Sequence, residues 1–117
     1  MNAFVKTAKG NFPNCFSGWV VHIQDHEIIT AKHYMGKWDK MIDIRVVEDA
    51  IKVFREEALC AYALDFGLTD DGKTTLIEFN DATSLGNYGM NEIYYAEMMA
   101  DRWFEITANG RKTHELI

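Results

Sequence analysis

Hydrophobic and polar residues alternate in four short stretches of the chain, and alternation over such lengths is typical of β-strands. The four stretches cover residues 16–23, 27–34, 60–68 and 74–80. A polar turn at residues 24–26 separates the first two, so residues 16–34 are predicted to form a β-hairpin. Asp71 and Gly72 favour a two-residue type I′ turn, which would join the last two strands into a second hairpin.

Two longer segments show the 3.6-residue periodicity of amphipathic helices. In residues 46–58 the apolar positions recur on one helical face and are Val47, Ala50, Ile51, Phe54 and Ala58. Residues 91–107 form the second predicted helix, with Asn91 as its N-cap and Gly110 as its stop. Its expected apolar side carries Ile93, Tyr94, Ala96, Met99, Ala100, Trp103 and Phe104.

The remaining segments complete the predicted organisation. Residues 3–6 read as the end of a strand, and residues 7–15, 36–43 and 83–90 read as loops. Two hairpins, each followed by a helix, predict an α+β fold. We expect an antiparallel sheet of about four strands with the helices packed on one face.

Length and charge narrow the classes of function. The chain has 117 residues, of which 48% are hydrophobic, so residues 1–117 are expected to form one globular domain. A formal net charge of −6 argues against nucleic acid or an anionic membrane as the main partner. No stretch has the length and apolarity of a transmembrane helix or a signal peptide, which predicts a cytoplasmic protein.

The second predicted hairpin brings two acids face to face. With Asp71 and Gly72 as its turn, Asp65 is paired with Glu78 across the two strands. Asn80 follows on the same face, and the neighbouring side chains on that face are small: Ala61, Ala63 and Gly67.

Opposed carboxylates repel each other and destabilise a strand pair unless something neutralises them. A divalent cation does so, and Mg²⁺ prefers carboxylate and amide oxygens. On geometry alone, two other interpretations stay open: a solvated polar face, or one acid paired with a nearby lysine.

The residues around this hairpin also carry a family resemblance. An acid near the end of one strand (Asp65) precedes Glu-x-Asn on the next (Glu78 to Asn80). Asp81, a Ser-Leu-Gly-Asn-Tyr-Gly loop at 84–89 and Arg102-Trp103 on the last helix follow. This combination resembles the C-terminal core of the ATP-grasp superfamily, in particular a clade of small phage and bacterial proteins. The resemblance covers residues 59–105 well and residues 16–58 only loosely.

The resemblance implies a chemistry and a set of ligands. ATP-grasp enzymes hold Mg²⁺-ATP between two α+β lobes and activate a carboxylate as an acyl-phosphate for attack by an amine or thiol. It implies that Asp65, Glu78 and Asn80 hold the Mg²⁺ that bridges the ATP phosphates. Asp81 and the 84–89 loop are expected on the acceptor side.

Other nucleotide contacts are sparser in this chain. Lys6 is the candidate strand lysine for the phosphates, with a solvated surface lysine as the alternative. Arg102 is a candidate phosphate ligand, with pairing to an acid such as Asp101 or Glu105 as the alternative. Gly18 and Val20 stand where the clade carries a glutamate and an arginine.

Three functions remain in competition. The chain is expected to be the C-terminal lobe of a Mg²⁺-ATP-dependent carboxylate–amine or carboxylate–thiol ligase, completed by a companion polypeptide or by a second copy. Its ligands would be a nucleotide and a small-molecule carboxylate acceptor. Alternatively it is a truncated, non-catalytic remnant that self-associates or binds a partner, or a structural domain without a ligand. An aromatic patch for such contacts is expected from Trp19, Tyr34, Trp38, Tyr88 and Trp103.

Overall fold

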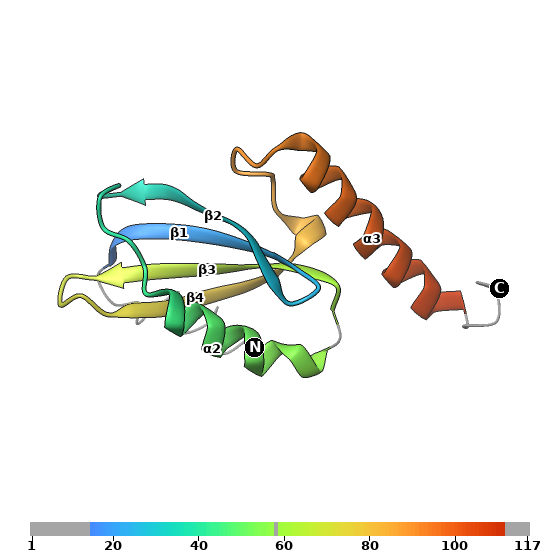
Figure 1. Cartoon of the computed structure of the whole chain (residues 1–117), viewed down its shortest axis with the longest axis horizontal. Helices are drawn as coiled ribbons and strands as arrows, with labels where there is room; N and C mark the ends of the chain where they lie inside the picture. The colour runs from blue at the N-terminus through green and yellow to red at the C-terminus, as the bar shows by residue number, and fades with distance from the viewer. Residues whose placement is uncertain (1–14, 58, 112–117) are drawn as a thin grey trace.

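The computed structural model describes residues 15–57 and 59–111, and these residues form an α+β fold around one sheet (Figure 1). Four antiparallel strands lie in the order β2-β1-β3-β4. They are β1 (Cys15–Gln24), β2 (Glu27–Gly36), β3 (Ala61–Thr69) and β4 (Thr74–Asp81). The helical elements are α2 (Ile44–Phe54), η1 (Arg55–Glu57), η2 (Ala82–Ser84) and α3 (Glu92–Arg111). The predicted class and the four-stranded antiparallel sheet are therefore confirmed.

The first hairpin follows the prediction closely. Gln24 pairs with Glu27, and the two residues between them, Asp25 and His26, both have positive φ angles of 52° and 64°. Two consecutive residues of positive φ define a type I′ turn, whose twist suits a hairpin. The predicted strand end at residues 3–6, and Lys6 with it, lies outside the described residues.

Helix α2 covers one face of the sheet and forms the main core with it. The helix begins two residues before its predicted start, because the Asp43 side chain accepts a hydrogen bond from the Arg45 amide as an N-cap. The buried residues of α2 are Val47, Ile51 and Phe54, as the periodicity predicts. They pack against strand residues of one face: Val21, Ile23, Tyr62, Leu64 and Phe66.

The second hairpin differs from the prediction in two places. Its loop has three residues, with hydrogen bonds from the Gly72 amide to the Thr69 carbonyl and from the Thr69 amide to the Lys73 carbonyl. Gly72 has a φ of 89°, which fits a turn followed by a left-handed residue. The pairing is therefore offset by one residue near the loop, where Phe66 faces Leu76, until a bulge at Ile77 restores the predicted register.

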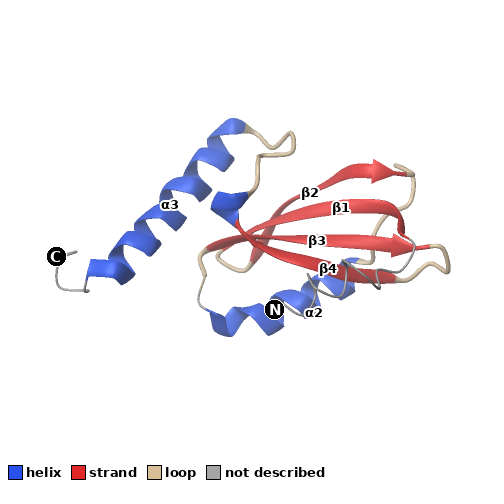
Figure 2. Cartoon of the chain, turned by 180° about the vertical axis from the view of Figure 1, so that it is seen from behind, coloured by secondary structure: helices blue, strands red, loops and turns tan. Residues whose placement is uncertain are grey.

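Helix α3 lies at the end of the sheet and does not join α2, which corrects the expectation that both helices share one face. Figure 2 shows the two helices on different sides of the strands. The α3 residue Met98 is buried with Ala61, Ala82 and Met90, and Ala61 projects from the sheet face opposite α2. Asn91 caps the helix as predicted, but α3 continues through Gly110 to Arg111.

The buried side of α3 is also not the predicted one. Met98 is fully buried and Tyr95 and Met99 are half-buried, whereas Ile93 and Phe104 are 68% and 56% exposed. Within the residues that the structure describes, no helix is long and apolar enough to cross a membrane.

Candidate functional site

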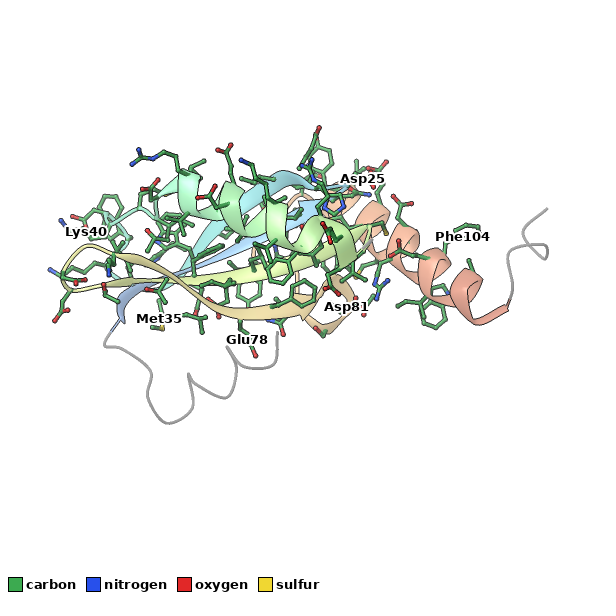
Figure 3. All side chains as sticks on the ribbon, turned by 90° about the horizontal axis from the view of Figure 1, so that it is seen from below. Asp25, Met35, Lys40, Glu78, Asp81 and Phe104 are labelled. Carbon is green, nitrogen blue, oxygen red and sulfur yellow. The ribbon has the colours of Figure 1, made fainter. Side chains whose placement is uncertain are left out.

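Asp65 of β3 and Glu78 of β4 are directly opposed partners in the sheet. Both side chains lie on the face opposite α2, here called the acidic face, and Figure 3 shows Glu78 pointing away from that helix. Asn80 lies two residues further along β4, opposite Ala63, and so belongs to the same face. The structure therefore brings together the three residues that the sequence predicts as metal ligands.

The charge of this pair is not balanced by a basic side chain. Among the described residues, neither Asp65 nor Glu78 forms a salt bridge with a lysine or arginine. Burial raises the pKa of Asp65 to about 6, and the negative charge of Glu78 raises it further, while a hydrogen bond from Tyr34 opposes both effects. The carboxylates thus meet in a half-buried position where a cation would relieve both burial and repulsion.

Tyr34 contacts Asp65, and the sequence analysis did not identify it as a metal-site residue. Its hydroxyl donates to both carboxylate oxygens of Asp65, at 2.8 Å and 3.0 Å. Tyr34 is the extra residue of a β2 bulge, because Gly18 pairs with Met35 and Trp19 pairs with His33. Bulges of this kind redirect a side chain, and simple strand alternation cannot reveal them.

The loop between η2 and α3 approaches the same face. His22 of β1 is fully buried, and its Nε2 atom lies 3.2 Å from the carbonyl oxygen of Gly86. Burial lowers the pKa of His22, although the contact with Gly86 opposes the shift, so the ring is neutral and donates to the carbonyl. The ring of Tyr88 lies 6.2 Å from His22 and 6.1 Å from Tyr34, between centroids. The loop thereby adds a second aromatic ring beside the one that contacts Asp65.

Asp81 and Arg102 contact each other. Arg102 donates to Asp81 from Nε at 2.9 Å and from Nη2 at 2.6 Å, and to Glu105 from Nη1 at 2.6 Å. Glu105 also accepts from the Cys60 amide, at 3.0 Å. Partial burial would raise the pKa of Asp81, but the hydrogen bonds from Arg102 and Thr83 lower it overall. This cluster ties α3 to the sheet, and the role of Asp81 and Arg102 toward a nucleotide stays a prediction.

The remaining predicted features lie elsewhere. Lys6 is outside the described residues. The five aromatics, all of them described, do not form one patch: Trp19 packs against the α2 core, Trp103 is exposed on α3, and Trp38 is exposed in the loop after β2. Of these five, Tyr34 and Tyr88 meet. Two pockets of about 400 Å³ and 390 Å³ lie beside α2 and α3, and neither is lined by Asp65 or Glu78.

The donor set of the acidic face suits a hard cation. In the part of the chain that the structure describes, no group of three His, Cys, Asp or Glu side chains is arranged to hold a metal. Two carboxylates and one amide oxygen leave coordination positions for water and phosphate, which is how Mg²⁺ is bound beside nucleotides. Asp65, Glu78 and Asn80 therefore fit a Mg²⁺ ion that shares its ligands with a phosphate.

Comparison with known proteins supports the same assignment. Residues 2–98 match a family of ATP-grasp domains, the second family of its clade. Among solved structures, the fold is similar to the ATP-grasp ligase PsnB, determined with a phosphomimetic variant of a minimal precursor, Mg and ADP. The TM-score is 0.50 at 16% identity over 72% of this chain, which corresponds to 30% of the PsnB chain. No curated protein sequence matches the chain.

Proposed function

Because the chain belongs to this family of ATP-grasp domains, we propose that it supplies the Mg²⁺- and nucleotide-binding C-terminal lobe of a ligase. The observation that carries this proposal is the opposed pair of Asp65 and Glu78, half-buried without a basic partner among the described residues. Such a pair is costly in a structural sheet and useful in a cation site.

Each residue of the acidic face has a distinct role in this proposal. Asp65 and Glu78 supply the negative charge that attracts the cation, and Asn80 supplies a neutral oxygen from the same strand as Glu78. When bound, Mg²⁺ would neutralise phosphate charge during phosphoryl transfer from ATP. The small side chains of Ala63 and Gly67, next to Asp65 on β3, allow a ligand to approach the sheet closely.

The lobe acts with a second part in this proposal. The chain matches 30% of the length of PsnB, and the family resemblance implies a nucleotide held between two lobes. A companion polypeptide or a second copy would supply the opposing wall. The reaction that we propose is activation of a small-molecule carboxylate for attack by an amine or thiol, with the cytoplasm as its compartment.

Calorimetric titration of Mg²⁺-ATP into the purified chain tests this function, with the oligomeric mass measured alongside. We expect saturable binding that is lost in Asp65→Asn and in Glu78→Gln. Asp70→Asn is the matched control, because it removes one carboxylate from the exposed hairpin loop. Equal binding in all four proteins, or none in the native chain, would contradict the proposal.

One observation favours a second candidate, a module that self-associates or binds a partner. Trp103 and Phe104 of α3 are 63% and 56% exposed, and Ile93 lies on the same helix at 68%. Ile93, Ala100 and Phe104 recur at helical spacing, so they form an apolar stripe opposite the buried Met98. Exposed stripes of this kind mark interaction surfaces. This candidate is compatible with the first, because a two-lobed enzyme also needs an interface.

A further inference from the structure

The Tyr34 hydroxyl occupies a particular position on the Asp65 carboxylate. Its oxygen is nearly equidistant from the two carboxylate oxygens, at 2.8 Å and 3.0 Å. This is the place, between both oxygens, that a cation takes when a carboxylate binds it with two oxygens. Tyr34 and a cation bound to Asp65 in that way therefore exclude each other.

The sheet is built to bring Tyr34 to this place. Tyr34 is the extra residue of the β2 bulge, and its ring crosses the backbone of the neighbouring strand β1 at Gly18. A Cβ atom at Gly18 would lie 2.8 Å from the ring atom Cζ of Tyr34 and 2.9 Å from Cγ of Met35. The absence of a side chain at Gly18 is thus a condition for the contact between Tyr34 and Asp65.

Tyr34 also has a route away from Asp65. It is 38% exposed, unlike the fully buried rings of the α2 core such as Tyr62. Its ring meets Tyr88 edge-on at 6.1 Å, and Tyr88 belongs to a loop rather than to the sheet. The ring can therefore turn toward solvent without breaking the main core.

We propose that Tyr34 gates the cation site by capping the Asp65 carboxylate until a cation displaces its hydroxyl. This inference rests on the proposed function and adds a residue that sets the affinity of the site. Loss of the hydrogen bond to a charged group is a cost that each binding event bears. Removal of the hydroxyl removes that cost and tightens cation binding.

Titration with Mn²⁺ alone, counting free Mn²⁺ by electron paramagnetic resonance at pH 8, tests the gate in the full chain. We expect Tyr34→Phe to bind Mn²⁺ about tenfold more tightly than the native chain, which corresponds to about 1.4 kcal/mol. Gly18→Ala keeps the hydroxyl but pushes the ring away, and we expect it to tighten binding as well. Tyr94→Phe is the control, because it removes an exposed hydroxyl from α3.

The possible outcomes separate the gate from the proposed function. Native binding that is unchanged or weakened in Tyr34→Phe overturns the gate and leaves the site. Binding by Tyr34→Phe and Gly18→Ala, with none by the native chain, supports the gate and contradicts nucleotide binding by the chain as it stands. Binding by none of the proteins overturns both.

Discussion

Asp65 and Glu78 face each other because two irregularities of the hairpin cancel. The three-residue loop shifts the pairing by one residue, so that Phe66 faces Leu76, and the bulge at Ile77 shifts it back before Glu78. A bulge adjoining two opposed carboxylates is a costly local arrangement. The chain thus retains at this point a geometry that serves a ligand better than it serves the sheet.

The raised pKa of Asp65 gives the site a signature in stability. Its value of about 6, against an ordinary 3.8, means that the folded chain binds this proton more tightly than the unfolded chain. The free energy of unfolding therefore falls as pH rises from about 4 to about 6 and levels off above. Asp65→Asn removes this penalty, which is at most about 3 kcal/mol.

Urea unfolding of the native chain and Asp65→Asn at several pH values measures this effect without metal. We expect the variant to gain stability over the native chain between pH 4 and pH 7. A difference that does not change with pH, or that shrinks as pH rises, would show that Asp65 is not strained by its surroundings.

The Arg102 cluster is expected to stabilise the attachment of α3. The Arg102 side chain is only 11% exposed and bonds to both Asp81 and Glu105. Arg102→Met leaves both acceptors without their cation and should lower the free energy of unfolding by about 2 kcal/mol. Arg45→Met is the control, because the Arg45 side chain is 86% exposed and its pair with Asp43 contributes little. Equal losses in the two variants would contradict a structural role for Arg102.

The backbone of Gly72 provides a test of the hairpin loop. Gly72 has a φ of 89°, and nothing lies within 4 Å of a Cβ built there, so an alanine meets backbone strain alone. Gly72→Ala should lower the free energy of unfolding by about 1 kcal/mol. Gly86→Ala also meets open space but has no positive φ, and it should be neutral or slightly stabilising. A harmless Gly72→Ala would contradict the left-handed backbone at this position.

The exposed stripe of α3 predicts an effect on association and not on folding. Phe104→Lys should lower the self-association measured by sedimentation velocity and change the free energy of unfolding by less than about 0.5 kcal/mol. Val53→Lys is the matched control, because Val53 is 71% exposed on α2. If both variants behave alike, the stripe is not an interface.

The sequence predicts the acidic pair well and the surroundings of the pair less well. Alternation of β3 and β4 placed Asp65 opposite Glu78, because the offsets of the loop and the bulge are equal and opposite. The same alternation placed Thr75 and Ile77 on the α2 face, where the structure has Leu76 and Phe79. Side-chain alternation carries no record of a bulge, so every residue beyond one is assigned to the wrong face until a second irregularity compensates.

Two other errors have physical causes of the same kind. The apolar side chains of α3 predicted its buried face, but the helix is held by Met98 together with the polar Arg102 and Glu105. A helix that attaches through charged hydrogen bonds leaves its apolar side exposed. The contact of Tyr34 with Asp65 was missed because it depends on the β2 bulge, although the small residue Gly18 on the neighbouring strand was a signal.

The most direct test of the account is the position of a bound cation in the native chain. Mn²⁺ broadens the nuclear magnetic resonance signals of the amides around it, so substoichiometric Mn²⁺ with ATP maps the site residue by residue. We predict that the amides of residues 64–66 and 77–80 broaden first and that excess Mg²⁺ restores them. Broadening that begins instead at the exposed acids of the hairpin loop, Asp70 and Asp71, would contradict a nucleotide-linked cation site between Asp65 and Glu78.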